Sequence, residues 1–201
     1  MDASVKQALE KWPNVPAVYG WLSLNERGHW HIHEQGDAMS GSSGAPITSP
    51  PIVAFIGRNY AADESGRWFF QNGPQRVYVR LDAAPYLLHV AQTGDGLVTH
   101  TGQTPSAILA WWLDEAGRLY ARTDLGGGLI DGRDLERVLS CLRIVPEQTP
   151  LLTALEDASA PATWRVSHPC YADIAPLHYG SPTSDVIKQL RFVANPTPAS
   201  A

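Results

Sequence analysis

Three histidines alternate along one short stretch of the sequence. His29, His31 and His33 occupy every second position of HWHIH, so in a β-strand all three side chains project from one face. Such a face could hold Zn²⁺ or Ni²⁺ in a metal-dependent enzyme, or it could be an exposed face whose histidines are only polar. Same-face side chains on one strand stand about 6.5–7 Å apart, which suits two ligands better than three. We therefore expect no cofactor, and we keep the metal enzyme as the alternative.

A second set of reactive side chains lies in RWFFQNGPQRVYVR, residues 67–80. The Asn72-Gly73 pair marks a turn. A loop of two or four residues would sort the side chains of the flanking strands onto two faces. The predicted core face is apolar: Trp68, Phe70, Val77 and Val79. The predicted opposite face, which we call the basic-aromatic face, is Arg67, Phe69, Arg76, Tyr78 and Arg80.

The basic-aromatic face has two interpretations. Guanidinium groups beside aromatic rings suit a small anionic or planar ligand, or the acidic surface of a partner protein. Alternatively, other elements cover the face and its arginines pair with the chain's own carboxylates. The leading hypothesis is a non-enzymatic ligand-sensing or protein-interaction module with its ligand site on this face. We assign no catalytic residue.

The remaining histidines and the cysteines carry no recognisable pattern. His89, His100, His168 and His178 are scattered single residues, for which we expect hydrogen-bonded structural roles. Cys141 and Cys170 match no zinc or redox spacing, and two lone cysteines fit a reducing cytosol. Cys141 follows an apolar helical stripe, which predicts a buried and inert thiol.

An α+β fold with a mostly antiparallel sheet, built from hairpins and covered by helices, is predicted to position these groups. Three turns share the pattern [Asn/Asp]-Glu-x-Gly, beginning at Asn25, Asp63 and Asp114. Their unequal spacing argues against a solenoid or propeller, and shared turn chemistry is favoured over internal duplication. Ser49 and Pro50 predict the start of one helix, and Asp131 the N-cap of another.

The chain is predicted to divide at residue 143. Residues 1–143 form the α+β core domain, and residues 144–201 form an irregular, proline-rich C-terminal arm that packs on this core rather than folding independently. The arm keeps large apolar residues such as Leu151, Trp164 and Tyr171, which a disordered segment would lack.

Composition narrows the function classes. The 201 residues carry a net charge of −5, which disfavours nucleic acid as a partner because binding to phosphates relies on excess Lys and Arg. No apolar run approaches the roughly 20 residues that span a bilayer, and the N-terminal residues have no apolar core of a secretory signal. We expect a cytoplasmic protein with no membrane partner.

Long aromatic motifs give the chain a family resemblance. Through KWPNVPAVYGWLSL, WFFQNGPQRVYVRL and DEAGRLYARTDLG, roughly residues 5–142 resemble an uncharacterised family of small proteobacterial cytosolic proteins. A weaker similarity is to a second family of unknown function with the order helix, D-x-G-x-W-F, two strands and D-A-P-[YF]. Its motif is matched here by Asp63, Gly66, Trp68, Phe69, Asp82, Ala84, Pro85 and Tyr86. The second resemblance implies an α+β fold around a curved antiparallel sheet, and neither implies an activity.

Overall fold

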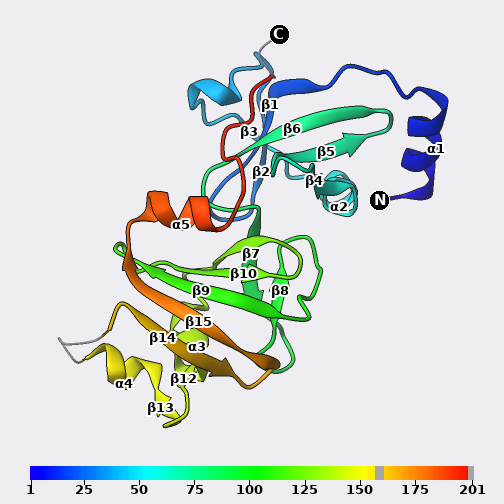
Figure 1. The fold of residues 1–201 in the computed structure, drawn as a ribbon. Coiled ribbons are helices and arrows are strands. Elements are labelled where there is room, and N and C mark those ends of the chain that lie inside the picture. The colour runs from blue at the N-terminus through cyan, green and yellow to red at the C-terminus, as the bar shows by residue number, and fades with distance from the viewer. Residues whose placement is uncertain (157–160, 199–201) are drawn as a thin grey trace. The chain divides into compact units, whose positions relative to one another are not determined.

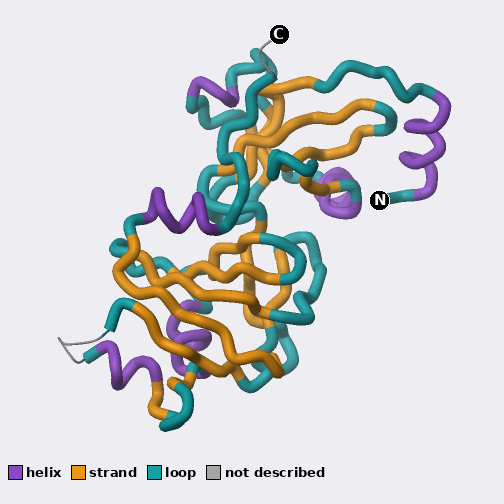
Figure 2. The backbone as a smooth tube through the Cα atoms, in the orientation of Figure 1, coloured by secondary structure: helices purple, strands orange, loops and turns teal. Residues whose placement is uncertain are grey.

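The computed structural model describes residues 1–156 and 161–198 and separates into two compact units (Figure 1). Unit 1 comprises Met1–Pro85 together with the C-terminal residues from Arg191, and unit 2 comprises Tyr86–Leu190. In each unit more of the described residues lie in strands than in helices, and the helices are short (Figure 2). The predicted α+β class is confirmed.

Unit 1 is built on one sheet with the strand order β3-β2-β1-β6-β5-β4. Strands β1 and β6 pair in parallel, and the other neighbouring strands pair antiparallel. The elements are α1 (Ala3–Lys11), β1 (Val18–Leu24), β2 (Trp30–Ile32), the 3₁₀ helix η1 (Ala38–Ser40), β3 (Ala45–Pro46), α2 (Pro50–Arg58), β4 (Tyr60–Ala62), β5 (Trp68–Asn72) and β6 (Gln75–Leu81). Helix α2 begins with Ser49 at its N-cap position and Pro50 in its first turn, as predicted.

Unit 2 is built on a longer sheet with the strand order β13-β12-β14-β15-β9-β10-β11-β7-β8. The β11–β7 and β15–β9 pairs are parallel and the rest antiparallel. The elements are β7 (Tyr86–Val90), β8 (Leu97–Thr99), β9 (Ile108–Asp114), β10 (Leu119–Thr123), β11 (Gly127–Ile130), α3 (Leu135–Cys141), β12 (Arg143–Ile144), β13 (Thr149–Pro150), α4 (Leu151–Leu155), β14 (Thr163–His168), β15 (Tyr171–Ser181) and α5 (Thr183–Gln189).

Five strands of each unit follow the same plan. The order β2-β1-β6-β5-β4 of unit 1 reappears in unit 2 as β8-β7-β11-β10-β9, with the parallel pair in the same place. The registers of the three-stranded part coincide with a constant offset of 51 residues: Phe69 pairs with Tyr78 as Tyr120 pairs with Leu129, and Ala61 pairs with Phe69 as Trp112 pairs with Tyr120. The two units therefore contain a structural repeat. The turn sequences alone favour the simpler interpretation, that the turns share only their local chemistry.

The structure divides the chain at residues 85 and 190, whereas the predicted boundary at residue 143 falls within unit 2. Residues 157–160 and 199–201 of the predicted arm lie outside the described residues. In the described part of that segment, β14 and β15 extend the sheet of unit 2. Strand β15 tolerates Pro176 because its pairing with β9 begins only at Leu177, so the absent amide interrupts no bond to β9.

The predicted turns are present, with one correction. The Asp114 turn joins the antiparallel strands β9 and β10, and the loop at Gly94 joins β7 and β8. Asp131 does not cap α3. Its side chain instead accepts a bond from the amide of Arg133 at 2.9 Å, and Asp134 takes the N-cap position.

The apolar core lies on the sheet of each unit. Leu22, Trp30, Ile56 and Val79 are buried in unit 1, and Leu88, Trp111, Leu119 and Leu177 are buried in unit 2. Among residues 1–156 and 161–198, we find no helix with the length and apolar character that crossing a membrane requires.

Candidate functional site

The three alternating histidines do not form one exposed row. His29 is exposed and His31 half-buried, while His33 is buried at the end of β2. Its Nδ1 lies 2.6 Å from Ser42 Oγ, and its Nε2 lies 2.8 Å from Ser23 Oγ. Ser42 in turn donates to Asp37. Both ring nitrogens of His33 are therefore engaged, and the described residues contain no cluster of three His, Cys, Asp or Glu side chains suited to a metal ion.

Burial favours the neutral form of His33. Its pKa is lowered from the ordinary histidine value, first by burial and then by the positive charge of Arg80. A neutral imidazole donates through one nitrogen and accepts through the other, which matches a chain of bonds from Ser23 through His33 and Ser42 to Asp37. This network fixes the loop that follows β2.

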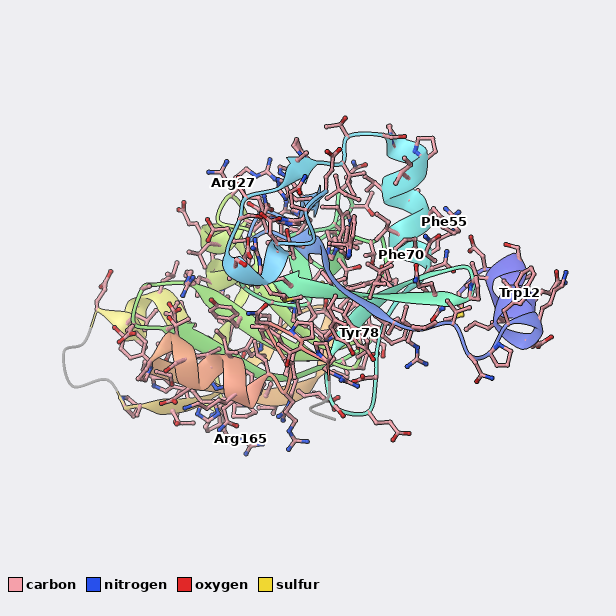
Figure 3. The ribbon with its side chains drawn as sticks, turned by 90° about the horizontal axis from the view of Figure 1, so that it is seen from above. Trp12, Arg27, Phe55, Phe70, Tyr78 and Arg165 are labelled. Carbon is pink, nitrogen blue, oxygen red and sulfur yellow. The ribbon has the colours of Figure 1, made fainter. Side chains whose placement is uncertain are left out.

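The basic-aromatic face exists with the predicted sorting of side chains. Strands β5 and β6 are joined by the two residues Gly73 and Pro74, and Phe69 lies opposite Tyr78. In Figure 3, Tyr78 and Phe70 can be located on this hairpin. The two rings of the face, Phe69 and Tyr78, contact each other edge to face at 5.8 Å. Tyr19 stacks on Tyr78 at 4.6 Å, so both rings are buried and the face is covered at its centre.

Two of the three arginines on this face have carboxylate partners in unit 1. Arg67 Nε lies 2.8 Å from Asp63 Oδ2, which also accepts the Tyr78 hydroxyl at 2.9 Å. Burial acts to raise the pKa of Asp63, but bonds from Arg67 and Tyr78 lower the pKa overall. Arg80 bonds Asp82 and the carbonyls of two residues in the loop after β2, and its side chain is only 13% exposed.

Arg76 differs from the other two arginines. It is exposed, its guanidinium lies 4.5 Å from the centre of the Phe69 ring, and no carboxylate pairs with it in the described part of the chain. The structure thus brings all five predicted residues onto one face, and of its three arginines Arg76 is exposed while Arg67 and Arg80 are half-buried.

The opposite face of the same hairpin lines a cavity of about 430 Å³. Its walls come from β1, β2, α2, β5 and β6 and the segments between them. The lining residues are Val18, Trp21, Leu22, Ile32, Ile47, Ile52, Ile56, Phe70, Asn72, Gln75 and Val77. Nine of these eleven side chains are apolar and none is charged. We call this cavity the apolar pocket.

A bulge in β1 helps to shape the apolar pocket. The β1–β6 register shifts between Val18 and Leu22, and Gly20 within it has φ +83°. A Cβ on Gly20 would stand 2.1 Å from the carbonyl oxygen of Gly36, so only glycine permits this close approach. A Cβ on Gly36 would in turn stand 3.5 Å from the Trp21 ring.

Helix α2 forms another wall. Phe55 of α2 meets Phe70 of β5 edge to face at 5.5 Å (Figure 3), and Ile56 is buried against the sheet. Ile52, one turn earlier, is 51% exposed beside the apolar pocket, and Trp21 is 44% exposed. Large apolar side chains left in water beside a concavity are typical of a ligand site.

The sequence pattern predicted the hairpin of β5 and β6 and assigned Phe70 and Val77 to a filled core, whereas both line the apolar pocket. The residues that line the apolar pocket come from separate elements of the sequence. Trp21, Ile32 and Ile52 each sit in an ordinary apolar pattern, and only the parallel pairing of β1 with β6 brings them together.

The scattered histidines and cysteines occupy unit 2. His168 is buried and His100 is half-buried, and burial lowers the pKa of both. His89 Nδ1 lies 3.4 Å from Asp131. Cys141 is half-buried and its pKa is raised, first by burial and then by Asp95. A raised pKa disfavours the thiolate that a nucleophile needs. The predicted burial of Cys141 is only partial, and the inertness of its thiol stays a prediction.

Together, the fold and the pocket define an α+β protein with two related units, one of which holds an apolar cavity. The chain belongs to the protein family of unknown function DUF2946, whose profile matches residues 1–197. The predicted resemblance to a family of unknown function is thereby confirmed.

Solved structures and curated sequences were also compared. The chain is similar to a DUF1285 family protein from Silicibacter pomeroyi DSS-3, with 16% identity and a TM-score of 0.48 over 94% of this chain and 99% of that chain. It is also similar to a DUF1285 family protein from Shewanella baltica OS155, with 13% identity and a TM-score of 0.40 over 59% of this chain and 89% of that chain. No curated protein matches the sequence.

Proposed function

We propose that the protein is a non-enzymatic binding module whose first unit takes a small, uncharged and largely apolar molecule in the apolar pocket. The observation that carries this proposal is the lining, which combines nine apolar side chains with no charge around a volume of about 430 Å³. Ligand pockets of roughly 300–1,000 Å³ are usually apolar with a few placed polar groups. Here the polar groups are the carboxamides of Asn72 and Gln75.

Burial of apolar surface would drive binding. Each 100 Å² of apolar surface removed from water contributes about 2.5 kcal/mol before the costs of association. The exposed rings and side chains of Trp21, Ile32 and Ile52 are the surface that such a ligand would cover. A charged ligand would lose its hydration without gaining a partner, which excludes ions from this pocket.

A neutral fluorescent probe tests the proposal. N-phenyl-1-naphthylamine is expected to bind saturably, with blue-shifted emission, and Ile52→Glu is expected to weaken this binding about tenfold or more because it places a charge at the entrance. The matched control is Leu109→Glu in unit 2, which alters a side chain of similar exposure, 46% against 51%. The proposal fails if the probe does not saturate, or if Ile52→Glu and Leu109→Glu change binding equally.

Arg76 supports a second candidate function, the binding of a small anion or of a partner protein's acidic surface. Its exposed charge over Phe69 is the specific observation. A fluorescent poly-glutamate peptide is the probe, and Arg76→Ala should lower its affinity at low salt while Arg165→Ala, another exposed arginine, should not. Equal losses in the two variants would leave only non-specific charge attraction.

A further inference from the structure

Unit 2 contains a second cavity with different chemistry. It measures about 220 Å³ and is lined by Trp112, His178, Ser181, Asp185, Val186 and Gln189. Strands β9 and β15 supply the rings, the end of β15 supplies the hydroxyl, and helix α5 supplies the carboxylate, the carboxamide and one apolar contact. We call this cavity the polar pocket.

The rings of the polar pocket are held in place from both sides. His178 lies directly opposite Trp112 in the β15–β9 pair, and their rings stack at 5.4 Å with 21° between their planes. His178 Nδ1 lies 3.3 Å from Thr163 Oγ1 on β14. The Arg122 guanidinium lies 5.8 Å from the centre of the Trp112 ring. These contacts hold the aromatic wall in one orientation. Within residues 1–156 and 161–198, Nδ1 is the ring nitrogen of His178 with a hydrogen-bond contact, so Nε2 can bond a ligand.

The helix presents a matched pair of polar groups. Asp185 and Gln189 are four residues apart on α5, so their side chains lie on the same face of the helix. Lys188 donates to Oδ1 of Asp185 at 2.9 Å, and the second carboxylate oxygen can accept a further bond. Gln189 offers both a donor and an acceptor, and Ser181 adds a hydroxyl that can do either.

This set of groups selects one kind of ligand. A carboxylate accepts bonds from an amino group, and a carboxamide can bond an amine and the adjacent ring nitrogen of a base together. Since a water molecule takes up about 30 Å³ in the liquid, the cavity has room for one small ring system. The carboxylate of Asp185 disfavours anions. The net charge of −5 also disfavours a phosphate chain, so the fitting ligand is a free base rather than a polynucleotide.

We infer that the polar pocket binds a small planar nitrogen heterocycle carrying an exocyclic amine, the chemical class of adenine and cytosine. This site lies beyond the proposed function of the apolar pocket, because it involves different residues in a different unit. It is also specific to unit 2. The residue of unit 1 that corresponds to Trp112 in the repeat is Ala61, which has no ring to offer.

Saturation-transfer NMR on the full chain tests the inference with adenine and cytosine as probes. Both are expected to bind saturably at millimolar concentrations. Uracil, which lacks the exocyclic amine, should bind about tenfold more weakly, the equivalent of one good hydrogen bond. Gln189→Leu should weaken adenine binding by a similar factor. Ser184→Ala alters an exposed residue of the same helix that does not line the cavity, and should change nothing.

Three results would overturn the inference: no saturable signal from either amine-bearing base, equal binding of uracil and cytosine, or unchanged adenine binding in Gln189→Leu. Because Gln189 is exposed, the fold is expected to survive its replacement. A second variant, Asp185→Asn, also changes an exposed residue and tests the carboxylate independently of Gln189. It removes the charge but keeps the shape, and it should weaken cytosine binding while Ser184→Ala does not.

Discussion

Asp63 and Asp114 occupy equivalent positions in the two units and bind their turns in the same way. Oδ1 of each accepts bonds from the backbone amides two and four residues later, and Oδ2 of each accepts the Nε of the arginine four residues later. Each Oδ2 also accepts a hydroxyl, from Tyr78 in unit 1 and Thr183 in unit 2. Burial acts to raise the pKa of each carboxyl, but these donors lower it overall.

Replacement of Gly20 should be far more costly than replacement of a glycine with the same backbone angle in open space. Gly20→Ala places a Cβ 2.1 Å from the Gly36 carbonyl oxygen, with an expected loss of about 3 kcal/mol or more in the free energy of unfolding. Gly41, with φ +82° and nothing within 4 Å, should lose only about 1–2 kcal/mol as alanine. Urea denaturation of the two variants measures the difference, and similar losses would contradict the close approach.

Replacement of Arg80 by alanine should destabilise the fold far more than replacement of Arg76. Arg80→Ala removes the guanidinium donor from the carbonyls of Ala38 and Ser42, although the Ala38 carbonyl keeps the amide of Gly41. An expected cost of about 2–3 kcal/mol follows from partly buried groups losing charged bonds. Arg76→Ala should cost no more than about 0.5 kcal/mol, as most surface changes do. Thermal melts of both variants check this ranking. A large loss for Arg76→Ala would remove Arg76 as a candidate binding residue.

The ionised carboxylate of Asp131 should stabilise the fold, and this stabilisation should be lost in strong acid. The bond from Arg133 is the main cause that lowers the pKa of Asp131 to about 2, against an ordinary value of 3.8. Its contribution is therefore complete above about pH 4 and is lost as the pH falls through about 2. The stability difference between the wild type and Asp131→Asn should be largest above pH 4 and close toward pH 2 in urea denaturation.

Arg133→Ala serves as the control for this pH dependence. It removes the main bond to Asp131 without touching the carboxyl itself, so most of the pH dependence should disappear. A difference between wild type and Asp131→Asn that stays constant from about pH 6 to about pH 2 would show that Asp131 has no lowered pKa.

His100 should stay neutral far below the usual titration range of histidine. Burial, with a smaller effect from His89, lowers the pKa of His100 to about 3. The unfolded chain takes up this proton near pH 6.5, so the contribution of His100 to stability is complete above that pH and is lost as the pH falls toward 3. In NMR, the His100 ring proton should show no titration between about pH 8 and about pH 4. A midpoint near 6.5 would contradict the lowered pKa of His100.

The sequence predicted the local features and missed the long-range ones. Alternation within RWFFQNGPQRVYVR predicted which side of the hairpin Phe69 and Tyr78 share, because strand periodicity is a local property. It could not predict that Tyr19 covers those rings or that Trp21 borders a pocket, since both depend on a bulge and on the parallel pairing of β1 with β6. Nothing in the local pattern brings segments about 60 residues apart together.

The repeat was hidden for a related reason. The two copies share the Asp-Glu-x-Gly-Arg turn, but at the paired positions Phe70 corresponds to Ala121 and Val77 to Gly128. In unit 2 a Cβ on Gly128 would stand 2.5 Å from the Leu88 side chain. At these two positions the same strand arrangement therefore holds large side chains in unit 1 and small residues in unit 2. The strand register is therefore the same in the two copies, while the residue types that pack at equivalent positions differ.

Unit 1 contains residues from before and after unit 2, and this fixes the order in which the protein can be completed. Val193 donates to the Gly66 carbonyl, and Leu81 donates to the Ala194 carbonyl, at 2.9 and 2.8 Å. During synthesis, every residue of unit 2 leaves the ribosome before Val193 and Ala194 emerge. Unit 2 can therefore finish folding first, and Gly66 and Leu81 gain these two partners only after Val193 and Ala194 have emerged.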